Sequence, residues 1–325
     1  MSRAEPLSAT VRAIRRRELR ALAQSISRIE RDDPAFAPVE RALYGETGRA
    51  MVVGITGPLG VGKSSLVSRL IAHLRSAHRT VAVVAVDPSS PFSGGSVLGD
   101  RIRMERDDHD SGVFIRSMAS RGHSGGIALA TRRAVRLLDA AGFGVILVET
   151  VGSGQVDVDI RDVASTSVVV LIPHLGDEVQ TLKAGLFEIA DVFCVNKSDL
   201  PGADQARRDL VELVAFGTPR DGWRPLVAAT STTLPSGIDE LWGSIERHER
   251  FLDEQGLRLP LRRRQVLREI IDLIQRRVEA EILPRADTDP EVRRLVDRVV
   301  GRALDPPSAA RRLLGAPAGS RSKRR

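Results

Sequence analysis

A glycine-rich octapeptide at 57–64 constrains the fold of this chain more than any other feature. It reads Gly-Pro-Leu-Gly-Val-Gly-Lys-Ser, and it follows an apolar run at 51–56 that predicts a buried strand. Residues 65–71 after it have helical spacing. A loop of this pattern between a strand and a helix surrounds phosphate oxygens with backbone N–H groups, and the helix N-terminus adds its dipole. The sequence therefore predicts a phosphate-binding loop.

Two side chains of this loop have specific expected roles. Lys63 reaches the β- and γ-phosphates, which makes it a candidate catalytic residue, and the Ser64 hydroxyl can ligate Mg²⁺. The candidate phosphate-binding residues are Gly57, Gly60, Val61, Gly62, Lys63, Ser64 and Ser65.

A second motif indicates which base is bound. Asn196-Lys197-Ser198-Asp199 follows the apolar run 192–195, and N-K-x-D at a strand end resembles the guanine-recognition motif of G proteins. The Asp199 carboxylate can accept hydrogen bonds from guanine N1–H and the 2-amino group, while the Lys197 stem packs along the base. Adenine lacks that donor pair, so ATP would leave the carboxylate unpaired. Ser231, in a loop after another strand-like run, is expected to make a backbone contact to the guanine oxygen. GTP and GDP are the expected ligands.

Composition narrows the remaining classes. The 325 residues contain one cysteine, Cys194, and no apolar stretch near the ~20 residues of a membrane span. Residues 1–5 do not resemble a signal peptide, so we expect a cytoplasmic protein without a membrane partner. The net charge of +7 is concentrated in residues 258–325, which hold 18 Lys/Arg and 9 Asp/Glu. No aromatic platform accompanies this charge, which favours a solvated helix face over nucleic-acid binding.

Strand-like and helical segments alternate between residues 50 and 243. This alternation predicts an α/β fold with a doubly wound, mostly parallel sheet and the ligand at the carboxyl ends of the strands. The expected strands are 50–56, 80–87, 112–117, 144–150, 166–173, 191–196 and 225–229. The expected domains are an N-terminal helical arm at 1–49 (with one helix over 8–31), a P-loop nucleotide domain at 50–256, a C-terminal helical dimerisation segment at 257–305, and a disordered basic tail at 306–325.

Three acids follow expected strand ends on the phosphate side. Asp87 and Glu149 end apolar runs, and Asp100 closes the glycine-rich stretch 94–99. Mg²⁺ prefers octahedral oxygen ligation and keeps several waters. We therefore expect Ser64, Asp87, Asp100 and Glu149 to form the metal site, with Asp100 and Glu149 also acting in hydrolysis.

The loop after Glu149 is expected to sense the γ-phosphate. The backbone N–H of Gly152 can donate to that phosphate, which makes this loop a sensor of nucleotide state. No glutamine follows Gly152 directly, where a Ras-like enzyme places its water-orienting residue. Slow intrinsic hydrolysis follows, and Gln155, Asp157 and Asp159 remain alternative residues for orienting the water.

Taken together, these segments resemble the MeaB/ArgK-type GTPases, which are chaperones of adenosylcobalamin-dependent acyl-CoA mutases such as methylmalonyl-CoA mutase. The resemblance covers about residues 15–280. Its most specific part is the pairing of Asp-Pro-Ser-Ser-Pro at 87–91 with Gly-Gly-Ser-Val-Leu-Gly-Asp at 94–100. Further matches are the segments 57–65, 122–126, 148–152, 183–191, 196–199 and 237–242.

The resemblance implies a homodimeric P-loop GTPase of the SIMIBI class that binds Mg²⁺ and gates cofactor loading of a partner mutase. This chain departs from the family pattern at Ser153 and Val156, at His174, and at Phe187. These positions fall in segments that are expected to respond to the bound nucleotide and to contact the partner, so they bear on which mutase is bound.

Other functions remain open at this point. A nickel-type metallochaperone GTPase needs clustered His/Cys ligands, and the histidines here are scattered. A transport-linked small-molecule kinase would need an acceptor lid and a general base. The third alternative is a regulatory module that binds GTP without hydrolysing it.

Overall fold

The computed structural model describes residues 4–88, 110–120, 126–150, 158–173, 186–234, 236–286 and 288–315. The chain forms two compact units, Met1–Gln265 and Val266–Arg325, and each is described by itself.

In the described part of the first unit, seven strands form one sheet in the order β3-β2-β4-β1-β5-β6-β7, and all neighbouring strands are parallel. The strands are β1 (Met51–Thr56), β2 (Val81–Pro88), β3 (Val113–Ser120), β4 (Val145–Thr150), β5 (Thr166–Leu171), β6 (Val192–Val195) and β7 (Leu226–Ala229). Each expected run overlaps one of them, although β2 and β3 extend past the expected ends at 87 and 117, so the predicted α/β fold with a parallel sheet is confirmed. β1, which leads into the phosphate loop, lies at the centre between β4 and β5.

Both faces of the sheet are buried, because alternate residues of each strand enter two different cores. In β4, Ile146 and Val148 belong to one core, while Val145 and Leu147 belong to the other. Every residue of β4 is buried. This double burial explains why the strands appear in the sequence as continuous apolar runs, as is typical of parallel sheets.

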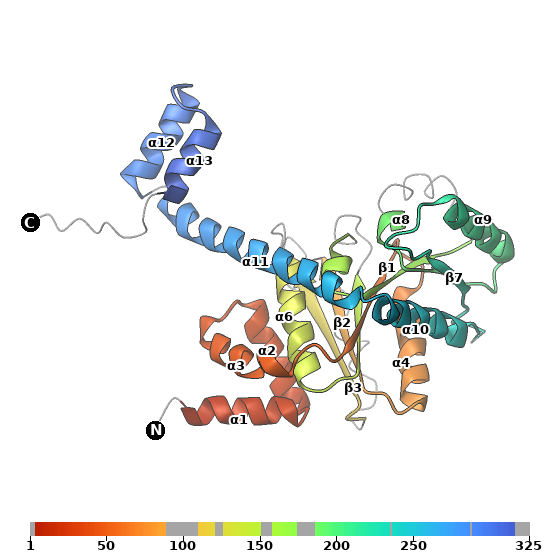
Figure 1. Ribbon diagram of the computed structural model, residues 1–325. Coiled ribbons are helices and arrows are strands. Elements are labelled where there is room, and N and C mark those ends of the chain that lie inside the picture. Colours follow the sequence, from red (N-terminus) through yellow and green to blue (C-terminus); the bar gives the residue numbers. More distant parts are fainter. Residues whose placement is uncertain are drawn as a thin grey trace, which may run out of the picture. The chain divides into compact units, whose positions relative to one another are not determined.

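Helices cover the two faces separately (Figure 1). One core is completed by α1 (Ala4–Arg15), α2 (Leu19–Glu30), α3 (Ala37–Leu43), α6 (Gly126–Ala140) and α9 (Ala203–Phe216). The other core is completed by α4 (Lys63–Ser76) and α10 (Ile238–Glu254). The short elements are η1 (Pro34–Phe36), η2 (Tyr44–Glu46), η3 (Val158–Asp162) and α8 (Leu186–Ile189).

The N-terminal arm differs from the single helix expected over 8–31. The structure places two helices there, α1 and α2, with a break at 16–18. Arg17 lies in the break with φ 57°. Its guanidinium donates to the carbonyl oxygens of Ala141 (3.0 Å) and Gly142 (2.8 Å), so a contact with the loop before β4 anchors the turn.

The second unit consists of helices. The helix α11 (Arg258–Ile282) starts in the first unit and is followed by η4 (Leu283–Arg285), α12 (Pro290–Val300) and α13 (Pro306–Gly315). Residues 306–315 thus form a helix where the sequence analysis expected a disordered tail, and residues 316–325 lie outside the described ranges. Asp305 explains this helix start, because its carboxylate accepts a hydrogen bond from the Ser308 backbone N–H at 3.0 Å.

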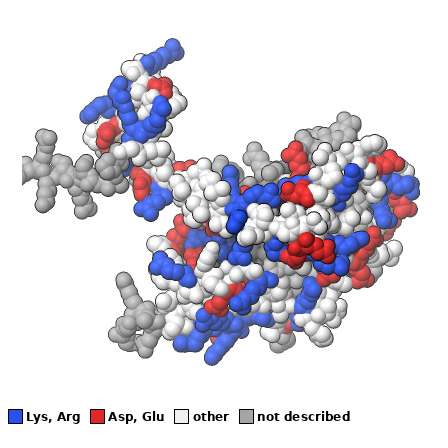
Figure 2. Space-filling model, viewed as in Figure 1, with Lys and Arg blue, Asp and Glu red and all other residues white. Residues whose placement is uncertain are grey.

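Basic and acidic side chains are interspersed over much of the face shown in Figure 2. Ion pairs between such side chains in the described part of the structure include those of Arg133 with Glu40 and of Arg258 with Asp253. None of the described helices is both long and apolar enough to cross a membrane.

Candidate functional site

The loop between β1 and α4 has the backbone of a phosphate cradle. Gly57, Gly60 and Gly62 have φ of 140°, 77° and 91°, in the region that favours glycine. A Cβ on Gly57 would lie 2.2 Å from the carbonyl oxygen of Val170 in β5. The glycines are therefore required both for the turn and for the close approach of the loop to the sheet.

Lys63, the first residue of α4, is held inside this loop. Its side chain is buried, and Nζ donates to the carbonyl oxygens of Gly57 (2.6 Å) and Pro58 (2.7 Å). The buried ammonium group thus lies against the backbone of the loop that would bind the phosphates of a nucleotide.

The predicted metal residues Ser64 and Glu149 meet in space. The Ser64 hydroxyl, at the start of α4, donates to Oε1 of the buried Glu149 near the end of β4. Hydroxyl and carboxylate oxygens are the donors that Mg²⁺ prefers, so this pair fits a magnesium site. Beside it, the buried hydroxyl of Thr150 donates to that of Thr56 at 2.8 Å, which joins the ends of β4 and β1.

Asn196 connects the base motif to the phosphate loop. This fully buried amide donates from Nδ2 to the Val61 carbonyl oxygen at 2.7 Å and accepts at Oδ1 from the Thr230 hydroxyl at 3.1 Å. Cys194 contacts the same hydroxyl at 3.1 Å, and burial raises the pKa of its thiol to about 12. The thiol is therefore protonated at neutral pH and can donate a hydrogen bond to the Thr230 hydroxyl in this buried series of hydrogen bonds.

The remaining residues of the base motif contact the phosphate loop and the loop after β7. Lys197 has φ 56°, and its Nζ donates to the Gly60 carbonyl oxygen at 3.0 Å, so its side chain spans the phosphate loop. Asp199 is exposed and accepts a hydrogen bond from the Ser231 hydroxyl. The sequence analysis expected a backbone role for Ser231; the structure adds a side-chain contact with the carboxylate that is expected to bind guanine.

Six predicted site positions lie outside the part of the structure that can be described in full. Asp100 and Gly152 lie outside the described residues. Asp87 lies in β2, but its side chain is outside the described part of the structure, and so is that of Asp159 in η3. Gln155 and Asp157 also lie outside the described ranges. The proposals for these residues stay predictions.

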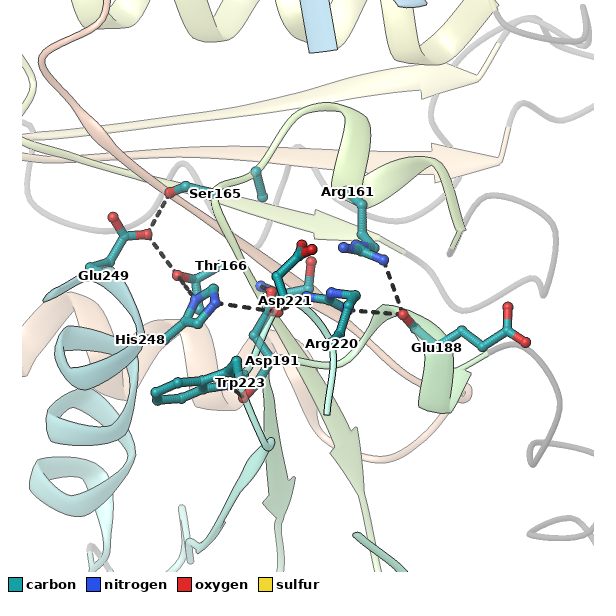
Figure 3. A network of polar contacts seen from close by, with 12 residues as sticks. Arg161, Ser165, Thr166, Glu188, Asp191, Arg220, Asp221, Trp223, His248 and Glu249 are labelled. Atoms are coloured by element: carbon teal, nitrogen blue, oxygen red, sulfur yellow. Dashed lines mark hydrogen bonds and ion pairs between the residues drawn. The ribbon is translucent and has the colours of Figure 1, made fainter. Parts of the chain in front are cut away.

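A second polar network lies at the amino ends of β5, β6 and β7 (Figure 3). The nucleotide residues lie at the carboxyl ends of the strands, so the two sites are at opposite ends of the strands. At its centre the buried Asp191 accepts from the Ser167 backbone N–H at 2.8 Å and pairs with Arg220. His248 Nε2 lies 3.5 Å from Asp191, and its Nδ1 lies 2.8 Å from the Thr166 hydroxyl. Burial lowers the pKa of His248. The sequence analysis missed this network, whose residues come from a strand, separate loops and a helix that are far apart in the sequence.

This network also includes η3, the element that follows the expected sensor loop. Arg161 of η3 and Arg220 both donate to the Glu188 carbonyl oxygen, at 3.0 and 2.9 Å. Gln265 of α11 donates to the carbonyl oxygens of Arg161 and Ala164, each at 2.9 Å. The start of α11 is thus fixed on η3.

Among the described residues, no three His, Cys, Asp or Glu side chains are arranged to hold a metal ion. The His/Cys cluster that a nickel-type metallochaperone needs is therefore not found in those ranges.

The parallel sheet, the glycine loop leading into α4 and the base motif after β6 define a P-loop nucleotide-binding protein. The sequence model of the family "Methylmalonyl Co-A mutase-associated GTPase MeaB" matches residues 22–287, and the chain belongs to this family. Guanine-nucleotide binding follows from this membership.

Individual relatives agree with the assignment. "Putative GTPase PH0274" of Pyrococcus horikoshii is 44% identical over 313 residues, which cover 94% of this chain and 96% of that protein. The mouse "Methylmalonic aciduria type A homolog, mitochondrial" is 34% identical over 272 residues, covering 81% of this chain and 65% of that protein. A crystal structure described as "LAO/AO transport system kinase" superposes with a TM-score of 0.73 at 27% identity, covering 97% of this chain and 98% of that one.

Proposed function

We propose that this protein hydrolyses GTP and acts as a chaperone of an adenosylcobalamin-dependent acyl-CoA mutase, gating cofactor loading and protecting the partner. The observation that carries the proposal is the match to the mutase-associated GTPase family over residues 22–287. The similarity to the mouse methylmalonic aciduria homolog supports the same partner class.

The site geometry supports the hydrolytic part of the proposal. Lys63 places a buried positive charge beside the phosphate loop, where it would stabilise charge on the β/γ-phosphates. Ser64 and Glu149 would hold Mg²⁺, together with Asp87 and Asp100, and the ion would neutralise phosphate charge when bound. Gly152 would donate to the γ-phosphate.

We further propose that intrinsic hydrolysis is slow and that the partner accelerates it, because no glutamine follows Gly152. A partner that favours the competent loops by ~3 kcal/mol raises their population up to ~100-fold if it starts small. The test is GTP turnover of the purified protein with and without each acyl-CoA mutase of its native host. We expect at least one mutase to bind and to increase the rate. Unchanged turnover with every mutase, and recovery of none in pull-downs, would refute the chaperone role while leaving the GTPase intact.

We also propose a homodimer formed through the C-terminal helices. α11 carries large apolar side chains that are about half exposed in the isolated chain, including Ile270 (47%), Leu273 (48%) and Ile274 (57%). Such a stripe at helical spacing favours a helix partner. In the full chain, Leu273→Asp combined with Ile274→Asp should convert dimer to monomer in light scattering, while Glu279→Ala should not. A dimer that survives the double substitution would remove α11 from the interface.

A further inference from the structure

Asp199 must hold a defined orientation to discriminate between bases, yet its side chain is exposed. A carboxylate that pairs with both N1–H and the 2-amino group of guanine has to present its two oxygens in the plane of the base. An aspartate that rotates freely about its side-chain bonds must be ordered when the base binds, and this ordering consumes part of the binding free energy on which selectivity depends. The surrounding contacts therefore decide how well the residue distinguishes guanine.

The Ser231 hydroxyl supplies one fixed contact. Its oxygen accepts a hydrogen bond from the Leu234 backbone N–H at 3.0 Å, and the hydroxyl donates to Oδ1 of Asp199. The direction of the bond to Asp199 is thus set by the turn 231–234. A displacement of this turn would move the hydroxyl and release the carboxylate.

The turn is held from outside by a residue of the phosphate helix. Arg69 of α4 donates to the Thr232 carbonyl oxygen from both Nε (3.2 Å) and Nη2 (2.8 Å). Two donors of one planar guanidinium on one oxygen fix the direction as well as the distance of the contact. Arg69 is six residues after Lys63 on the same helix, so the turn is fastened to the element that binds phosphate.

We propose that Arg69 is a positioning residue for guanine selectivity, because it fixes through Thr232 the turn whose Ser231 hydroxyl orients Asp199. Arg69 touches neither the base nor the phosphates in this scheme; it acts through the turn. The inference rests on the guanine-binding role proposed for Asp199, and it is independent of the mutase partner.

Base analogues separate this role from a general structural one. GDP engages Asp199 through N1–H and the 2-amino group, whereas inosine diphosphate, IDP, offers N1–H alone. In the parent protein we expect Kd for IDP to exceed Kd for GDP by about 10-fold or more. In Arg69→Met the affinity for GDP should fall about 5- to 10-fold and that for IDP by less, so that the ratio shrinks to about 3. Arg69→Lys keeps the charge but loses the paired N–H donors of the guanidinium. Its ratio of Kd values should lie between those of the parent and of Arg69→Met.

Two further variants sharpen the comparison. Arg17→Met removes a guanidinium that likewise donates to backbone carbonyl oxygens, those of Ala141 and Gly142 before β4, and it should leave the ratio unchanged. Adding Ser231→Ala to Arg69→Met should change the ratio little further, because both act on one contact.

The measurement is calorimetric titration of the full chain with GDP and IDP in the presence of Mg²⁺. If the affinities for GDP and IDP fall equally in Arg69→Met, or if neither affinity falls, the positioning role is wrong. A parent protein that binds GDP and IDP equally would overturn the role of Asp199 and this inference with it. Retained discrimination in the parent and in Arg69→Met alike would overturn only the role of Arg69.

Discussion

Replacing Arg220 with methionine should destabilise the first unit through the carboxylate that it leaves behind. Asp191 has a side-chain exposure of 3%, against 31% for Arg220. Removing one partner of a buried ion pair costs about 3–5 kcal/mol. Because Arg220 is nearly one-third exposed and water can reach its position, we expect a smaller loss, about 2–3 kcal/mol at pH 8.

The loss should depend on pH through His248, which faces Asp191 at 3.5 Å. Burial lowers the pKa of His248; Asp191 and Glu249 oppose this, while Arg220 and Arg161 add to the lowering. In the parent, the unfolded chain takes up the histidine proton below about pH 6.5 before the folded chain does, so stability is lost as the pH falls through that region. Without Arg220 the pKa of His248 rises, and the imidazolium can pair with Asp191. The destabilisation by Arg220→Met should therefore be smaller at pH 5.5 than at pH 8.

Urea unfolding at both pH values, followed by circular dichroism and by the fluorescence of Trp223 and Trp242, measures this difference. The matched control is Arg264→Met, because Arg264 and Asp221 are both well exposed and 3.6 Å apart, and it should cost less than about 1 kcal/mol. An Arg220→Met variant as stable as the parent at pH 8, or one destabilised equally at both pH values, would refute the reasoning.

Three further predictions concern the nucleotide site and the sheet. Asp199→Asn should shift the preference toward xanthosine nucleotides, whose 2-oxo group replaces the amine, while the parent should bind ATP at least ~100-fold more weakly than GTP; competition titrations test both. Lys63→Ala should lower GTP turnover by orders of magnitude, because it removes charge at the phosphates, and single-turnover hydrolysis measures this. Gly54→Ala should cost about 1–3 kcal/mol in urea unfolding, because its Cβ would lie 2.3 Å from Cγ1 of Ile160 in η3. Parent-like behaviour in any of these assays would contradict the corresponding assignment.

The sheet could be predicted because both of its faces are buried. Each strand then needs apolar residues at successive positions, and short runs rich in valine and isoleucine stand out between helical segments. The phosphate loop and base motif could be found for a similar reason, since each is a contiguous stretch at a strand end. Spacing alone did not reveal the break between α1 and α2, because Val11, Ile14 and Leu22 keep an apolar face across it.

The contacts that orient the site could not be predicted in this way. Arg69 is an exposed arginine on a helix, and no pattern in the sequence connects it with Thr232, 163 residues away. The helix at 306–315 did have a local signal, because Asp-Pro-Pro at 305–307 is typical of a helix start. The low-complexity composition around it led to the wrong expectation of disorder there.

The phosphate and base halves of the site are joined by contacts on two sides, so substitutions in one half should affect the other. Asn196 donates to the Val61 carbonyl oxygen in the phosphate loop, and Arg69 on the phosphate helix donates to Thr232 beside the base. An exposed carboxylate discriminates well only when its orientation is fixed before the ligand arrives, since ordering it afterwards consumes binding energy. Because these contacts fix the loops around Asp199 to the loop and helix that hold the phosphates, we expect guanine selectivity to depend on the integrity of α4 as much as on the N-K-x-D motif itself.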